Sequence, residues 1–272
     1  MKEKQILLNE GDRTINYLQQ GTGDICLLFL HGWCINSAYW ANQLSYFSTQ
    51  FSVYAPDLPG FGKSIAHRDS WTIKAFANDI IDFIHALELK NVVVIAHSMA
   101  GEIMLEMALA GRIDLVGLIG VDNFKFVDVE FTPDQLEQFQ AFLPLLQSDF
   151  RSHAPVYAEN MLFHPGTPGE IQKRVKSDFS AADPQVGYGS FVNLMQYATN
   201  VPSKLELLSN KLHLVNTSFP PTNVQGLATR CRYGYELRTI EACGHYPMLE
   251  KPVEFNRLLQ STLSEIMVEA PV

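Results

Sequence analysis

A serine and a histidine that are far apart in the chain have surroundings typical of nucleophilic catalysis. Ser98 lies between the apolar stretches VVVIA and EIMLEMALA, which predicts a tight turn between a buried strand and a helix. Such a turn exposes the serine hydroxyl at the carboxyl end of a sheet and requires small neighbours, which Ala96 and Ala100 provide. His245 follows a predicted strand on the loop CGHYP, where it could act as a general base. Each motif alone also fits a simpler role, a serine at a helix start or a solvated loop histidine.

Two backbone amides are candidates for stabilising the negative charge that such a nucleophile would create. The stretch ICLLFL runs into HGW, and Gly32 lets the backbone there approach a ligand closely. The amide of Trp33 could therefore pair with the amide of Met99, at the start of the helix after the serine, as an oxyanion hole. Gly32, His97 and Tyr246 flank these residues and are predicted to contact the substrate.

The elements that must position these residues are visible as alternating apolar runs and amphipathic stretches. Short apolar runs predict strands that are buried on both faces of a parallel sheet. Thr72–Leu89, with apolar residues at intervals of three and four, and the stretch after Pro252 are predicted helices. QILLN and TINYLQQ, joined through Gly11, predict a hairpin. The fold class is therefore α/β with a mostly parallel sheet. The predicted buried strands are Ile25–Leu30, Phe51–Ala55, Val92–Ala96, Leu115–Val121, Leu212–Val215 and Tyr235–Ile240.

The alternation breaks between residues 123 and 200. Prolines at intervals through this segment predict several short helices. The segment also holds 9 of the 17 phenylalanines, which fits an apolar lid, and equally a helical subdomain that packs its own aromatic rings. The chain is therefore predicted to have a core made of residues 1–122 and 201–272, with a helical cap at 123–200 inserted between them.

The composition excludes several classes of protein. A net charge of −9 over 272 residues argues against nucleic acid or an anionic membrane as a partner. No apolar run approaches the ~18 residues that span a bilayer, and the N-terminus lacks the apolar stretch of a signal peptide, so a cytoplasmic location is expected. The four cysteines and eight histidines show no metal-ligand spacing, and the sequence GKS at 62–64 lacks the first glycine of a phosphate-binding loop. We predict a small-molecule substrate, no cofactor and no metal.

Taken together, FLHGW, YAPDLPGFGKS, AHSMAG and CGHYPMLEKP resemble motifs of the α/β-hydrolase family, in the family's order. The resemblance covers nearly the whole chain and points to the serine-nucleophile, cap-containing, esterase-like branch. It implies an eight-stranded, mostly parallel sheet flanked by helices, with a helical cap inserted after the sixth strand. It also implies that Ser98 is the nucleophile, His245 the general base, and the Trp33 and Met99 amides the oxyanion hole. Asp57 in DLPGFGKS is interpreted as structural.

One residue of the family pattern is missing from its usual place. In most of the family, the acid that orients the histidine follows the seventh strand, but here no Asp or Glu occurs between Glu206 and Glu236. Asp122 comes directly after the run LVGLIGV, and the order Ser98, Asp122, His245 fits the family order. Asp122 is therefore the predicted catalytic acid, which would hold the imidazole tautomer. The alternative is that Asp122 only caps a turn.

These residues predict an enzyme that cleaves a small-to-medium, apolar ester through an acyl-enzyme. Other branches of the family also use a serine, so a carbon–carbon bond hydrolase, a perhydrolase of the haloperoxidase type and an acyltransferase stay open. A hydrolase-like receptor that binds a ligand beneath its cap is the alternative outside enzymes.

Overall fold

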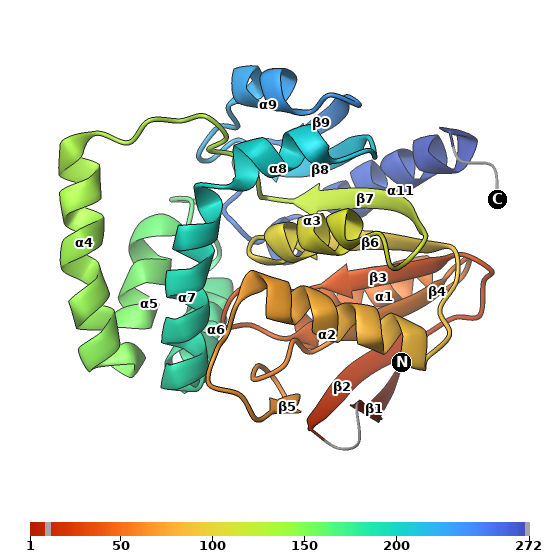
Figure 1. Ribbon diagram of the computed structural model, residues 1–272, viewed down its shortest axis with the longest axis horizontal. Coiled ribbons are helices and arrows are strands. Elements are labelled where there is room, and N and C mark those ends of the chain that lie inside the picture. The colour runs from red at the N-terminus through yellow and green to blue at the C-terminus, as the bar shows by residue number, and fades with distance from the viewer. Residues whose placement is uncertain (9–11, 270–272) are drawn as a thin grey trace.

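The computed structural model describes residues 1–8 and 12–269, and its centre is a nine-stranded sheet (Figure 1). The strand order is β1-β2-β4-β3-β6-β7-β8-β9, with β5 paired to β2. β2 is antiparallel to both β1 and β4, and all pairs from β4 to β9 are parallel. The strands are β1 Lys2–Leu8, β2 Arg13–Gln20, β3 Cys26–Leu30, β4 Ser52–Pro56, β5 Ile65–Ala66, β6 Val92–His97, β7 Leu115–Val121, β8 Leu212–Thr217 and β9 Tyr235–Ile240.

The predicted α/β fold with a mostly parallel sheet is confirmed. All six apolar runs form strands, and every residue of β3 and β6 is buried, as expected for the middle of a parallel sheet covered on both faces. The sheet has one strand more than the eight expected, because β5 adds two residues against β2, too few to leave a pattern in the sequence. β1 and β2 pair as the predicted hairpin, but Gly11 in its turn lies outside the described residues.

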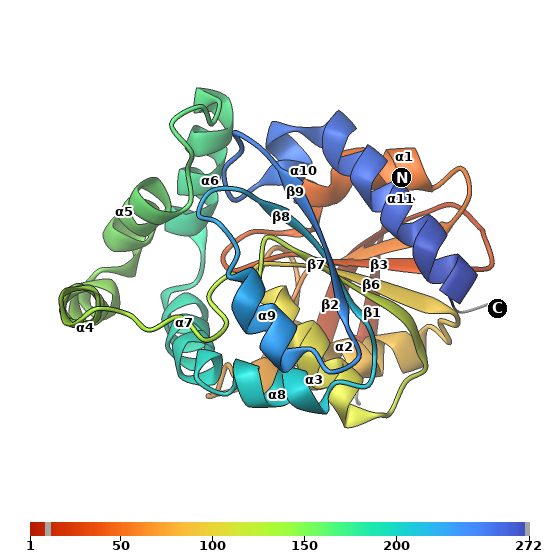
Figure 2. The ribbon, with the colours of Figure 1, turned by 90° about the horizontal axis from the view of Figure 1, so that it is seen from above.

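Helices cover both faces of the sheet (Figure 2). α2, α3, α8 and α9 lie on one face, and α1, α10 and α11 lie on the other. The outer helices and the short turn before them are η2 Ser37–Trp40, α1 Ala41–Phe47, α2 Ile73–Ala86, α3 Ala100–Ala110, α8 Val201–Leu207, α9 Val224–Arg230, α10 Pro247–Glu250 and α11 Pro252–Glu269. The predicted helix at Thr72–Leu89 begins with Thr72 as its N-cap, whose hydroxyl accepts a hydrogen bond from the Ala75 amide at 3.1 Å. It ends before Glu88, which has a positive φ of 51°.

Four further helices between β7 and α8 gather beyond the carboxyl ends of the central strands (Figure 1). They are α4 Pro133–Ser148, α5 Phe150–Met161, α6 Gly169–Ala181 and α7 Pro184–Ala198. Pro133 and Pro184 begin α4 and α7, as prolines in first turns do, but Pro144 and Pro155 lie inside α4 and α5 without ending them. The helices are therefore longer than the proline spacing predicted. The role of this segment as a cap stays a prediction.

Trp33 joins this helical layer to the sheet. Its indole Nε1 donates a hydrogen bond to the Gly187 carbonyl of α7 at 2.9 Å. A side chain at Gly187 would collide with the ring of Phe150, with a Cβ only 2.1 Å from Cζ, so glycine is required for this packing. The indole is surrounded by aromatic rings of α5, α6 and α7, with centroids 4.9–5.8 Å away: Phe150, Tyr157, Phe179 and Phe191.

Candidate active site

Ser98 lies on a strained turn between β6 and α3, as the sequence predicts. Its φ is 52°, in the left-handed region that non-glycine residues seldom adopt. The turn is held on both sides, because the Ser98 amide donates to the Val121 carbonyl at 3.0 Å and the Gly101 amide donates to the Ser98 carbonyl at 2.7 Å. Ala96 and Ala100 are fully buried beside it. This geometry fixes the serine at the carboxyl end of the sheet.

Asp122 lies on a second strained turn, directly after β7. Both Asp122 and Phe124 have positive φ, 50° and 52°. The peptide groups of Asn123, between them, are held from β8: the Asn123 amide donates to Asn216 Oδ1 at 3.2 Å, and Asn216 Nδ2 donates back to the Asn123 carbonyl at 2.9 Å. Asn123 Nδ2 also donates to the Ala96 carbonyl at 2.9 Å, which ties this turn to the strand that ends at the serine.

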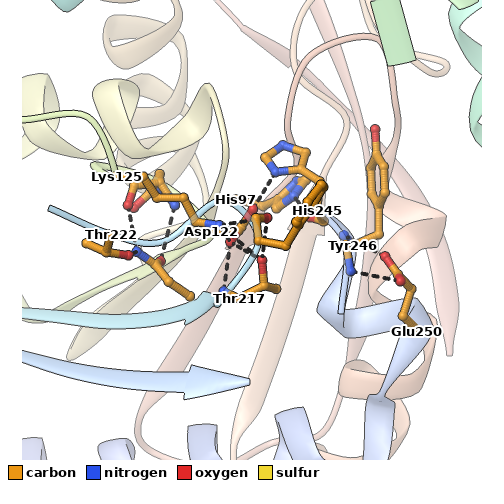
Figure 3. Close-up of polar contacts among 12 residues, drawn as sticks. His97, Asp122, Lys125, Thr217, Thr222, His245, Tyr246 and Glu250 are labelled. Atoms are coloured by element: carbon orange, nitrogen blue, oxygen red, sulfur yellow. Dashed lines mark hydrogen bonds and ion pairs between the residues drawn. The ribbon is translucent and has the colours of Figure 1, made fainter. Parts of the chain in front are cut away.

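The two oxygens of the Asp122 carboxylate have different partners (Figure 3). Oδ2 accepts a hydrogen bond from His245 Nδ1 at 2.6 Å. Oδ1 accepts from the amide and the hydroxyl of Thr217, at 2.8 and 2.9 Å, and pairs with the Lys125 ammonium at 2.5 Å. Burial disfavours the ionised carboxylate, but the hydrogen bond with His245 and the charge of Lys125 outweigh it, so the pKa of Asp122 lies well below its usual range. The aspartate is therefore ionised.

The loop that carries His245 is organised by Glu250. The Glu250 carboxylate accepts hydrogen bonds from the amides on either side of the histidine: from Gly244 at 3.0 Å, and from Tyr246 at 3.2 Å (Figure 3). His97 holds the same loop from β6, because its Nε2 donates to the His245 carbonyl at 2.8 Å. Burial, and the neighbouring His245, hold the pKa of His97 well below its usual range, so this ring is neutral. Because Nδ1 of His245 is hydrogen-bonded to Asp122, Nε2 is the free nitrogen of this ring.

The loop after β3 is held next to the serine. His31 bridges two backbone groups: its Nδ1 donates to the Gly32 carbonyl and its Nε2 accepts from the Leu58 amide, both at 2.8 Å. A Cβ on Gly32 would lie 3.0 Å from Ser98 Cβ, so the loop passes as close to Ser98 as glycine allows. Within the described chain, the amides of Trp33 and Met99 donate no hydrogen bond, and both remain available to an oxyanion.

Ser98 and His245 line the same small cavity, which has a volume of about 30 Å³ and room for about two water molecules. A shallower groove of about 460 Å³ lies elsewhere, between Ile25, Gln50 and α11, and its lining includes no histidine or cysteine. The Ser98 hydroxyl makes no hydrogen bond to any described residue, including His245, a common feature of sites without substrate. The cavity is lined by Trp33, His97, Ser98, Tyr157, Leu162, Phe179, Phe191, Leu194, His245 and Tyr246.

The cavity contains no cluster suited to a metal: among residues 1–8 and 12–269, no group of three or more His, Cys, Asp or Glu side chains could hold an ion. Within the same ranges, no helix combines the length and apolar character needed to cross a bilayer. Asp57, interpreted from the sequence as structural, accepts hydrogen bonds from the Asn16 side chain of β2, the Ser37 amide of η2 and the Lys63 amide, which tie the loop after β4 to both elements.

A model of the alpha/beta hydrolase family matches residues 27–258, and the chain belongs to this family. The chain is 34% identical to the (E)-2-((N-methylformamido)methylene)succinate hydrolase of Acinetobacter baylyi over 112 aligned residues, and the alignment covers 41% of this chain and 42% of that protein. The chain is also 31% identical to the pimeloyl-[acyl-carrier protein] methyl ester esterase of Wigglesworthia glossinidia brevipalpis over 103 aligned residues, and this alignment covers 38% of both proteins. The chain thus spans about two fifths of these relatives. A thermophilic esterase structure from Thermogutta terrifontis has the same fold, with a TM-score of 0.79, 20% identity and coverage of 98% of this chain and 99% of that one.

The structure brings together the residues that the sequence singled out, and adds others that it did not. Ser98, His97, Trp33, His245 and Tyr246 line one cavity, with Asp122 behind His245 and Gly32 and Met99 beside Ser98. The supporting residues were missed: His31, Lys125, Asn216, Thr217 and Glu250. A lysine three positions after the candidate acid, between Phe124 and Phe126, was the one local signal available.

Proposed function

We propose that the protein is a serine hydrolase that cleaves a small, apolar carboxylic ester through an acyl-enzyme. One observation carries the proposal: the 2.6 Å hydrogen bond from His245 Nδ1 to an ionised Asp122, in a cavity that also contains Ser98 on a strained turn. A nucleophile, a general base and an acid that fixes the tautomer of the base are the three parts that acyl transfer needs.

In the proposed mechanism, Ser98 Oγ attacks the ester carbonyl while His245 Nε2 takes its proton. The hydrogen bond to Asp122 keeps the other proton of the ring on Nδ1 and stabilises the imidazolium that forms. The amides of Trp33 and Met99 stabilise the oxyanion of the tetrahedral intermediate. His245 then protonates the leaving alcohol, and a water molecule, activated by the same nitrogen, hydrolyses the acyl-enzyme.

The lining of the cavity supports a small, uncharged acyl group. Its walls are mostly aromatic and aliphatic, and within its lining only His97 and His245 could carry charge. Five of the lining side chains come from the predicted cap segment, so we propose that these helices move apart when substrate enters: Tyr157, Leu162, Phe179, Phe191 and Leu194. The Tyr246 side chain is buried, and its hydroxyl makes no hydrogen bond in the described chain, which leaves the hydroxyl as a donor for a substrate oxygen.

The relatives support ester or related acyl chemistry, since one is named as a methyl ester esterase and another as a hydrolase of a formamido compound. The carbon–carbon hydrolase, perhydrolase, acyltransferase and receptor alternatives use the same fold, and a substrate panel separates them from the esterase. Cytoplasmic location and a small-molecule substrate stay predictions.

A fluorophosphonate probe and a set of nitrophenyl esters test the proposal. We expect the wild type to be labelled at Ser98 and to hydrolyse acetyl and butyryl esters faster than octanoyl esters, with amide, lactone and diketone substrates as comparisons. Ser98→Ala should abolish both signals. Ser218→Ala is the matched control, because the Ser218 side chain, after β8, makes no hydrogen bond in the described chain and its loss should change neither. Ester turnover that survives in Ser98→Ala would refute the covalent mechanism.

A further inference from the structure

Lys125 is a buried lysine that the proposed mechanism does not use. Its side chain is 4% exposed. The ammonium has three donors, and three acceptors lie around it: Asp122 Oδ1 at 2.5 Å, Thr217 Oγ1 at 3.0 Å and the Phe219 carbonyl at 3.3 Å. A buried ammonium is tolerated only when it is paired and fully hydrogen-bonded, and this one meets both conditions. Lys125 is therefore a fixed positive charge inside the site.

The position of that charge changes the electrostatics of the proposed general base. An ionised aspartate beside a neutral histidine normally leaves the pair with a negative charge, which favours protonation of the histidine. Here Lys125 neutralises Asp122 from the opposite oxygen, so the three groups together carry no net charge until His245 is protonated. The ammonium also occupies Oδ1, which leaves Oδ2 as the oxygen that faces the imidazole.

The other titratable groups around His245 do not replace this charge. His97 of β6 is neutral, with its ring centroid 4.6 Å from that of His245. Glu250 of α10 accepts a hydrogen bond from the backbone of the His245 loop, at the Gly244 amide. His164, from the predicted cap segment, accepts a hydrogen bond at Nδ1 from the Gly166 amide. The Tyr246 phenol stays neutral, because burial raises its pKa well above the usual range. A substitution at Lys125 removes none of these groups.

We propose that Lys125 is a positioning residue that acts through Asp122: it fixes the rotation of the carboxylate and keeps His245 unprotonated, and hence active as a base, down to lower pH. The inference rests on the proposed function of the site. One carboxylate separates the ammonium from the imidazole, so the two charges lie on the order of 7 Å apart. At an effective dielectric constant near 20, the lysine therefore lowers the pH midpoint of the acid limb of activity by about one to two units.

Lys125→Met tests the inference, because methionine keeps most of the length of the side chain without the charge. The midpoint of the acid limb of kcat/KM should rise by about one to two pH units relative to the wild type. The sign follows from electrostatics: without the ammonium, Asp122 favours the imidazolium more strongly, and the base needs a higher pH to lose its proton. Thr217→Val is the matched control, since it removes a hydrogen bond to the same carboxylate oxygen without removing a charge, and it should lower kcat with little displacement of the midpoint.

A second measurement keeps this test separate from the proposed function. In Ser98→Ala protein, which needs no ester turnover, the same Lys125→Met change should displace the NMR titration of the His245 ring upward by a similar amount. If the wild type hydrolyses no ester, the NMR titration still decides the role of Lys125. Lys125→Gln, which keeps donors without the charge, takes the place of the methionine variant if that variant does not fold. A midpoint within about 0.3 pH unit of the parent protein in both measurements would overturn the inference.

Discussion

Asp122→Asn should inactivate the site through the tautomer of His245, and the contacts of the carboxylate show why. Three donors converge on Oδ1: the Thr217 amide, the Thr217 hydroxyl and the Lys125 ammonium. In the variant, the amide oxygen of the asparagine must occupy that position, because an NH₂ group there would face three donors. The NH₂ group is then directed at His245 Nδ1, which must accept instead of donate. The ring proton moves to Nε2, and Nε2 can no longer take a proton from Ser98.

The expected loss of activity follows from the wrong tautomer, and the expected loss of stability follows from a buried lysine without its countercharge. We expect kcat to fall by about 10⁴-fold, the loss measured where an asparagine replaces the acid of a serine–histidine–aspartate site. The free energy of unfolding should also fall, by about 3–5 kcal/mol, because the buried Lys125 ammonium loses the charge that compensates it. These two effects are separable, because the Thr217 amide and hydroxyl still orient the asparagine when Lys125 is replaced, whereas the stability loss needs the ammonium.

Steady-state kinetics with a nitrophenyl ester and urea denaturation of the same preparations provide the assay. The double variant Asp122→Asn/Lys125→Met should regain most of the lost stability and none of the lost activity. Turnover within about tenfold of the wild type in folded Asp122→Asn would refute the reasoning, because the three donors on Oδ1 would then not fix the orientation of the side chain. A double variant as unstable as the single one would show that the ion pair is not the source of the stability loss.

Two further substitutions test the close packing around Ser98 and the buried carboxyl group of Glu102 in α3. In Gly32→Ala, the new Cβ would lie 2.8 Å from His97 Nδ1 and 3.0 Å from Ser98 Cβ; we expect kcat to fall by about 10–100-fold with little change in Tm, whereas Gly169→Ala, where nothing lies within 4 Å, should leave both unchanged. Burial raises the pKa of Glu102 to about 8, so the folded protein holds a proton that the unfolded chain releases near its ordinary value of 4.5, and stability is lost as the pH rises between these values. Glu102→Gln should therefore raise the free energy of unfolding by about 1–3 kcal/mol at pH 8 and by little at pH 4.5, and an equal gain at both would contradict this origin.

The sequence predicted the parts of the site that follow from local pattern. The apolar runs specify where the strands end, and Ser98, Asp122 and His245 each come within a few residues of a strand end. Asp122 was predicted to be the acid because the usual position after the next strand holds no acid, and its role stays a prediction. The length of helices α4 and α5 was not predictable from proline spacing, because Pro144 and Pro155 lie inside these helices without ending them.

The supporting residues were not predictable, because their roles depend on contacts between strands. Asn216 and Thr217 look like ordinary polar residues at a strand end, and only the pairing of β7 with β8 places them against the Asp122 turn. Trp33 likewise gives no sign in the sequence that its indole is enclosed by helices more than a hundred residues away. Such contacts are set by tertiary packing, which local patterns do not contain.

The end of β8 explains how the proposed acid, Asp122, can lie after β7. In the pattern that the sequence resembles, this strand end supplies the carboxylate; here it supplies donors, the Thr217 amide and hydroxyl, to a carboxylate that comes from the neighbouring strand. An acid at either strand end can reach the same histidine, because both strands are parallel and end at the same edge of the sheet. Moving the acid also moves it next to Lys125, three residues further along the same turn. The displaced acid therefore acquires a buried countercharge, and the pH dependence of the site should differ from that of an acid held by neutral donors alone.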